Sequence, residues 1–147
     1  MQTDPFRDQE TFMVAFGQAT RGENPEQFLL YQNLVMEETQ ELFTALKALR
    51  DLIVDHERLS PEALIRHNAD VVDGAIDTMV VLIGLLFSMG IRPDKAWREV
   101  HASNMAKLDE NGKPIYRKDG KVQKPATWRA PDLARVVIES WEKNHAA

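Results

Sequence analysis

The chain has 147 residues, of which 44% are hydrophobic and 28% charged, with a net formal charge of −5. This composition is ordinary for one soluble globular domain, here residues 1–147, and gives no reason to expect a nucleic acid or an anionic membrane as partner. The absence of cysteine excludes disulfides and thiolate-zinc sites, and together with an amino-terminus that lacks a signal-peptide pattern it favours a cytoplasmic location.

Two helices are expected in the first third of the chain. The first spans about residues 6–19 and has a short apolar face made by Phe12, Met13 and Phe16. The second starts after Asn24, which is suited to be an N-cap before Pro25, and Gln27 is the expected capping-box partner. Apolar residues then recur at helical spacing as far as Ile53.

A third long helix is expected from residue 62 to residue 89, after Ser60 and Pro61 and before Gly90. Its stretch of 14 residues from 78 to 91 is too short for a membrane span and is expected to be buried. Residues 79–87 are apolar nearly all the way round, more than a small four-helix domain can cover. We therefore expect a homodimer or homotetramer.

Both long helices carry a stripe of carboxylates. At 100° per residue, Glu41 lies about 40° from Glu37 and about 60° from Glu38. Asp70, Asp73 and Asp77 fall within an arc of about 60° on the next helix. Two such stripes would repel each other unless a cation lay between them, and hard carboxylate oxygens suit Mg²⁺ or Mn²⁺. No Glu-x-x-His occurs, so the main signal for a di-iron bundle is missing.

The last third of the chain combines two shorter helices with a loop or small hairpin. A helix begins after Pro93 and carries Trp97 and Asn104, with Lys107 one turn beyond. Asn-Gly and Asp-Gly turn signals then fill residues 108–130, and a final helix spans about 131–144. Residues 107–124 hold six basic and three acidic side chains, a window that suits an anionic ligand. The fold class is therefore all-α, a bundle of four to five helices.

These residues resemble a known family, the all-α nucleotide pyrophosphohydrolases of the MazG-like group, relatives of phosphoribosyl-ATP pyrophosphohydrolase. Residues 37–42, Glu-Glu-Thr-Gln-Glu-Leu, are similar to that family's EExxE element. Asp77 and the apolar run after it are similar to the aspartate that opens the next long helix. Residues 100–108, Val-His-Ala-Ser-Asn-Met-Ala-Lys-Leu, resemble the late helix that supplies asparagine and lysine to the ligand.

The resemblance implies Mg²⁺-dependent hydrolysis of a nucleoside triphosphate to the monophosphate and pyrophosphate. On it we place the metal at Glu38, Glu41, Asp73 and Asp77. The catalytic residues are then Glu37 and Glu38, with Glu37 orienting or deprotonating the attacking water. Candidate phosphate contacts are Lys107 and Lys124, with Arg117 a weaker one; Asn104 is a candidate for ribose or base, and Phe16, Trp97 or Tyr116 for stacking. Phe12, Phe16 and Trp141 are nevertheless expected to be packing residues.

One departure from the family pattern keeps alternatives open. The family's second element is ExxD, whereas Gly74 lies three residues before Asp77, and Asp73 stands in four residues away. Aspartate is one methylene shorter than glutamate, so the number and position of the metals stay open. Hydrolysis of phosphoribosyl-ATP or another nucleotide derivative is the alternative reaction. A helical module that binds nucleotide or a protein partner without catalysis is the alternative class.

Overall fold

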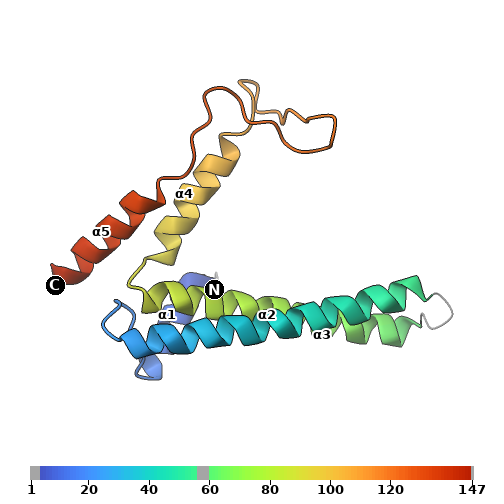
Figure 1. Ribbon diagram of the computed structural model, residues 1–147, viewed down its shortest axis with the longest axis horizontal. Helices are drawn as coiled ribbons and strands as arrows, with labels where there is room; N and C mark the ends of the chain where they lie inside the picture. The colour runs from blue at the N-terminus through green and yellow to red at the C-terminus, as the bar shows by residue number, and fades with distance from the viewer. Residues whose placement is uncertain (1–3, 56–59, 147) are drawn as a thin grey trace. The chain divides into compact units, whose positions relative to one another are not determined.

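The structure, a computed structural model, describes residues 4–55 and 60–146, and in these ranges it contains five α-helices and no strand (Figure 1). They are α1 (Pro5–Ala15), α2 (Pro25–Val54), α3 (Pro61–Ser88), α4 (Pro93–Met105) and α5 (Leu133–His145). The all-α prediction is confirmed. The chain divides into two compact units, one up to Gly90 and one from Ile91 onward. The single-domain expectation stays a prediction.

The helix starts follow from their capping residues. The side chain of Asn24 accepts hydrogen bonds from the backbone N–H groups of Glu26 and Gln27, at 3.1 and 3.3 Å. Ser60 caps α3 in the same way, through Ala63 N–H at 3.1 Å. These bonds satisfy N–H groups that have no partner inside the helix.

The predicted capping box at α2 is wrong in its second half. The amide of Gln27 does not return to Asn24 but bonds the backbone of Ala19, accepting from its N–H at 2.8 Å and donating to its carbonyl at 2.6 Å. Gln27 is buried, so the two bonds also satisfy an amide that would otherwise be costly to desolvate. The residue fastens the α1–α2 connection instead of closing the cap.

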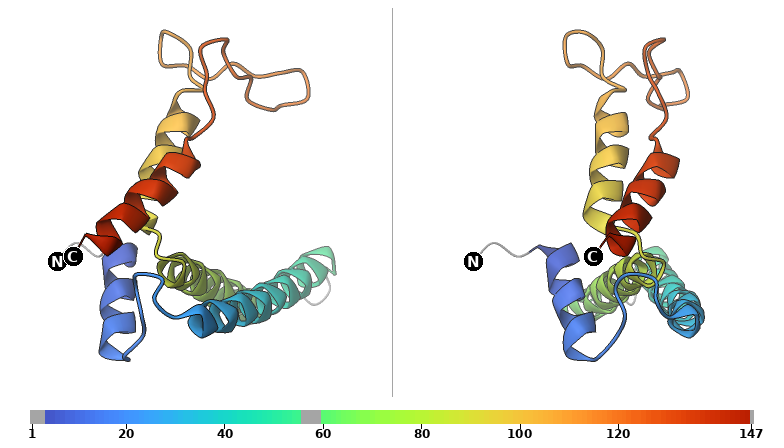
Figure 2. Two further views of the ribbon diagram at one scale, coloured as in Figure 1. Left: turned by 60° about the vertical axis from the view of Figure 1, so that its left-hand side comes forward. Right: turned by 90° about the vertical axis from the view of Figure 1, so that its left-hand side faces the viewer.

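In the first unit, α2 and α3 lie side by side along their length, and α1 packs against α3 (Figure 1 and Figure 2). The core consists of Met13, Tyr31, Val81, Ile83 and Phe87. The Tyr31 ring lies against Gly84, where an added Cβ would be 2.1 Å from the ring atom Cε1. The Tyr31 hydroxyl donates to Gln18 Oε1 at 2.7 Å, and burial raises the pKa of Tyr31. Gly84 therefore leaves the space into which the Tyr31 ring packs in the core.

The apolar face predicted for α1 is only partly right. Met13 is completely buried, but Phe12 and Phe16 are 45% and 70% exposed and pack on each other with their ring centroids 4.4 Å apart. Their expected packing role is therefore limited to that contact. The other buried residue of α1 is Gln9, one turn before Met13. A short helix that contacts essentially one neighbour buries one narrow stripe, and the rest of its apolar residues remain at the surface.

Helix α3 buries only part of its apolar surface within this chain. Val81, Ile83 and Phe87 are buried, whereas Met79 and Leu82 are 48% and 42% exposed. By length and composition alone α3 is long and apolar enough to cross a membrane, and it is alone in this among the described residues. A core helix of a soluble protein passes the same test, so this is weak support for a span. The exposed apolar residues agree with the expectation that a single chain cannot cover residues 79–87.

In the second unit, α4 and α5 lie side by side and are joined by ion pairs (Figure 2). Arg135 bonds Glu99 across the pair and Glu139 on its own helix, both at 2.9 Å. Between the helices, two antiparallel bridges, Leu108 with Pro114 and Tyr116 with Val122, enclose the Asn-Gly and Asp-Gly turns. The expected loop or small hairpin at residues 108–130 is therefore a loop with two tight turns, each closed by one antiparallel bridge.

Candidate functional site

Part of the α2 stripe and all of the α3 stripe line an open cavity of about 410 Å³ between the two helices, whereas Glu37 and Glu38 are not among its lining residues. Among its lining residues are Glu41 from α2 and the three aspartates of α3, Asp70, Asp73 and Asp77. For Asp70 the sequence favours a surface position over a role as a further ligand, and the residue is exposed. The structure places it on the cavity with the other two, as its angle of about 20° from Asp77 on the helix would allow. Gln40 and Thr44, which the sequence did not single out, also line the cavity.

The pKa of Glu38 is raised by burial and by the negative charges of both stripes. Desolvation is the largest cause that raises its pKa, followed by the charges of Glu41, Asp77, Glu37 and Asp73 in that order. A carboxylate on α2 is therefore within electrostatic reach of two aspartates on α3. This is the juxtaposition that the spacing of the stripes predicts, and without a cation it disfavours the ionised form of Glu38.

This shift predicts a pH dependence for the metal-free protein. The folded state holds the Glu38 proton more tightly than the unfolded state does, because its pKa is raised. Protonated Glu38 therefore stabilises the fold fully at pH values below the ordinary pKa of glutamate. This stabilisation is lost as the pH rises through the raised pKa of the folded state. Glu38→Gln should therefore be more stable than the wild type at neutral pH, with a smaller difference at mildly acidic pH. Thermal unfolding in a chelator across this range measures it.

The control is Glu26→Gln, a change in the first turn of the same helix, outside the cavity. It should follow the wild-type dependence on pH. If Glu38→Gln and the wild type lose stability in parallel as pH rises, the charge repulsion at Glu38 is refuted.

The donors at this cavity have the chemistry that a hard divalent cation needs, namely carboxylate oxygens. Among the described residues, no three His, Cys, Asp or Glu side chains converge closely enough to hold one ion. Glu41, Asp73 and Asp77 are exposed, so their side chains have rotamers available that do not disturb the core. The residues fit the metal by type. They would hold it after a change of side-chain rotamer that brings their carboxylates closer together.

Gly74, the departure from the family pattern, is buried at the contact between α2 and α3. A Cβ added there would lie 3.1 Å from Leu42 Cα, tighter than ordinary van der Waals contact. A glutamate at this position would therefore meet the backbone of α2, next to Glu41. The structure thus gives a packing reason for the missing carboxylate, because the helices approach each other closely at this position.

The remaining predicted site residues belong to the second unit. Lys107 Nζ donates to Asn104 Oδ1 at 2.7 Å, so these two side chains form a pair near the end of α4. Trp97 and Tyr116 are each 63% exposed. Arg117 pairs with Asp119 at 3.1 Å in the second turn. The roles of these residues toward a ligand stay predictions.

Lys124 has a neighbour that the sequence did not indicate. Its ammonium lies 3.6 Å from the ring centroid of Trp128, in cation–π geometry. Trp128 Nε1 in turn donates to the Ser103 carbonyl at 2.9 Å, and Ser103 Oγ donates to the Arg129 carbonyl at 2.9 Å. The end of the 108–130 segment is thereby attached to α4. Contacts 25 residues apart in the chain leave no local periodic signal.

The structure is an all-α chain in which two long packed helices both carry carboxylates, and this agrees with the family resemblance noted in the sequence. Residues 10–104 match the family described as phosphoribosyl-ATP pyrophosphohydrolase. The match covers more than half of the chain, including both acidic stripes, and the chain belongs to this family. No curated protein matches it. Membership confirms the resemblance seen in the sequence and indicates a pyrophosphohydrolase acting on a nucleotide.

Proposed function

We propose that this protein hydrolyses a nucleoside triphosphate, in ribo or deoxy form, to the monophosphate and pyrophosphate, and that the reaction depends on Mg²⁺ or Mn²⁺. The observation that supports it best is the meeting of Glu41, Asp73 and Asp77 at one cavity between α2 and α3. A triphosphate carries about four negative charges, so binding beside these carboxylates requires bridging cations. Family membership supports the reaction class.

Glu38, Glu41, Asp73 and Asp77 are the residues we assign to the metal. When bound, the metal would neutralise the phosphates and stabilise charge on the leaving pyrophosphate. The raised pKa of Glu38 is consistent with a carboxylate surrounded by negative charge that a cation would relieve. Thr44 and Gln40, on the same cavity, offer neutral hydrogen-bonding groups to water or phosphate.

Glu37 and Glu38 are our candidates for the catalytic carboxylates. In the proposed step, the oxygen of a water attacks the α-phosphorus, the bond to the bridging α,β-oxygen breaks, and pyrophosphate leaves with the electron pair. The proton of the attacking water passes to the carboxylate of Glu37, which also orients the water. Glu37 is exposed on the acidic stripe and contributes to the negative charge around Glu38.

A nucleotide panel tests the proposal. Purified protein with Mg²⁺ is assayed for pyrophosphate release from ribo- and deoxynucleoside triphosphates, modified nucleotides and phosphoribosyl-ATP. We expect turnover of at least one triphosphate. Turnover of phosphoribosyl-ATP alone would establish the alternative reaction. Binding of a non-hydrolysable triphosphate in calorimetry, with no turnover of any compound, would establish the non-catalytic module.

Substrate contacts are proposed for Asn104, Lys107, Lys124, Tyr116 and Trp97, on the sequence resemblance and on residue type. Lys107→Ala should raise KM for the triphosphate by about 10- to 100-fold with a smaller effect on kcat, because one charge-assisted phosphate contact is lost. Steady-state kinetics at saturating Mg²⁺ measure this. Lys113→Ala, in the same basic segment, is the control and should leave KM unchanged. An unaltered KM for Lys107→Ala would mean that this lysine does not contact the substrate.

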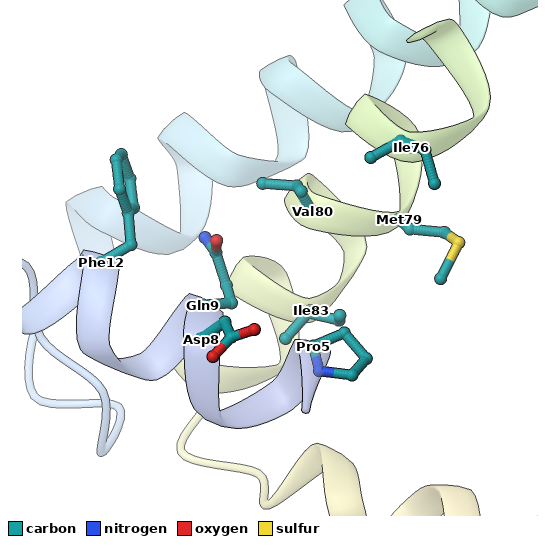
Figure 3. A pocket seen from close by; sticks show the side chains of 8 residues that line it. All are labelled: Pro5, Asp8, Gln9, Phe12, Ile76, Met79, Val80 and Ile83. Atoms are coloured by element: carbon teal, nitrogen blue, oxygen red, sulfur yellow. The ribbon is translucent and has the colours of Figure 1, made fainter. Parts of the chain in front are cut away.

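We also propose that the protein acts as a homodimer or homotetramer. An open groove of about 410 Å³ lies between α1 and α3 and is lined mainly by apolar side chains (Figure 3). Those side chains are Pro5, Phe12, Ile76, Met79, Val80 and Ile83. Exposed apolar surface of this kind is commonly covered by another subunit. Sedimentation equilibrium decides the matter, and a mass of one chain at micromolar concentration would refute it.

A further inference from the structure

The three aspartates of α3 surround one small residue. Asp70, Asp73 and Asp77 lie four residues before, one residue before and three residues after Gly74 on the same helix. All four residues line the cavity opposite Glu41. Gly74 is buried, and a Cβ added to it would make a tight contact with the backbone of Leu42, the residue after Glu41.

The distance between α2 and α3 at Gly74 therefore depends on the absence of a side chain at this position. Leu42 Cα, Cβ and N would lie 3.1, 3.4 and 3.4 Å from a Cβ at position 74, and two of these atoms belong to the α2 backbone. A backbone cannot rotate away as a flexible side chain can. An alanine at position 74 therefore requires the two backbones to give by a few tenths of an ångström, and a larger residue requires more, which takes the aspartates away from Glu41.

We infer that Gly74 is a positioning residue for the metal. By allowing α3 to approach α2 closely, it lets short aspartates reach a cation that is shared with the longer glutamates of α2. This inference rests on the proposed function, since it concerns the same cavity. Carboxylate ligands must be held at metal–oxygen distances that are fixed within a few tenths of an ångström. The close contact of α2 and α3 at Gly74 would therefore set the positions of the ligands in addition to packing the helices.

The test measures metal affinity apart from turnover. Mn²⁺ binding to the full chain is followed by electron paramagnetic resonance of the free ion, for the wild type, Gly74→Ala and Gly74→Val. We expect Mn²⁺ affinity to fall about tenfold in Gly74→Ala and further in Gly74→Val, as for other residues that position metal ligands. The thermal midpoint of metal-free Gly74→Ala should change little, because the better helix propensity of alanine opposes the tighter contact.

A longer ligand should compensate for a wider gap. Asp73→Glu in the Gly74→Ala background should recover part of the lost Mn²⁺ affinity, because it adds one methylene of reach. A purely structural glycine would lower the thermal midpoint and would not be rescued by a longer acidic side chain. Wild-type Mn²⁺ affinity in Gly74→Ala, or no recovery in the double variant, would overturn the inference.

Asp73→Glu in the native background keeps the inference testable if the Gly74 variants do not fold. It should bind Mn²⁺ no more tightly than the wild type, because the native spacing already suits aspartate. A tenfold gain in affinity would mean that the native aspartates do not reach the metal, and would overturn the inference, as would a wild type that binds no Mn²⁺. The nucleotide panel decides the proposed function separately, since it scores wild-type turnover and not the relative affinities of variants.

Discussion

Glu41→Gln should lower turnover by about a thousandfold or more while the protein remains folded. A carboxylate that holds the metal stabilises the transition state by several kcal/mol, and about 1.4 kcal/mol corresponds to a factor of ten in rate. The amide keeps nearly the same shape but removes one negative charge from the cavity that Glu41 shares with Asp73 and Asp77. Thermal unfolding of the metal-free variant should occur at the wild-type temperature or slightly above it, since charge repulsion is relieved.

Two comparisons make this result specific. Glu26→Gln, on the same helix but outside the cavity, should retain wild-type turnover. Circular dichroism should show equal helix content in both variants, so that a loss of activity cannot be attributed to unfolding. Wild-type turnover in Glu41→Gln would remove this residue from the active site.

Gly84→Ala should destabilise the protein more than Gly74→Ala, because the added Cβ comes much closer to its neighbours. The new Cβ would lie 2.1 Å from Cε1 and 2.5 Å from Cζ of the Tyr31 ring, which is 3% exposed and has little room to move. Overpacking of a core typically costs about 1–3 kcal/mol, and the gain in helix propensity on replacing glycine returns about 1 kcal/mol at most. We expect a net loss of about 2 kcal/mol, measured by urea unfolding.

A double-mutant cycle shows whether the Tyr31 ring is the cause. Tyr31→Phe keeps the ring but removes the hydroxyl, which bonds Gln18 and also interacts with Gln9, and should cost about 1 kcal/mol without relieving the clash. Tyr31→Leu removes the ring atoms that the new methyl group meets, so Gly84→Ala should cost clearly less in that background. Additive effects of Gly84→Ala and Tyr31→Leu would show that the strain lies elsewhere.

Most of the helical framework could be predicted because its signals are local. Asn24 and Ser60 followed by proline mark the starts of α2 and α3 to within about one residue. Apolar periodicity gives the lengths of these helices. What periodicity cannot give is which apolar residues find a partner. Phe12 and Phe16 lie on the predicted face of α1, but they are exposed because the helix packs through Gln9 and Met13.

At the candidate site, the stripes were predictable and their surroundings were not. Residue spacing alone puts Glu37, Glu38 and Glu41 on one side of α2, and the pKa of Glu38 shows that α3 presents aspartates to it. The contact of Gly74 with Leu42, and the pairing of Lys124 with Trp128, join segments whose distance in space depends on tertiary packing. A glycine in a helix is ambiguous in sequence, since it weakens the helix and also permits close approach.

The ammonium of Lys124 over the Trp128 ring provides this protein with a built-in optical reporter. The fluorescence of an indole ring responds to a nearby positive charge. The emission of the two other tryptophans, at positions 97 and 141, can be removed by substituting them with phenylalanine. A phosphate group that draws Lys124 off the ring would change the fluorescence of Trp128 during binding. The proposed phosphate contact of Lys124 can therefore be tested in real time, without a label and without waiting for product.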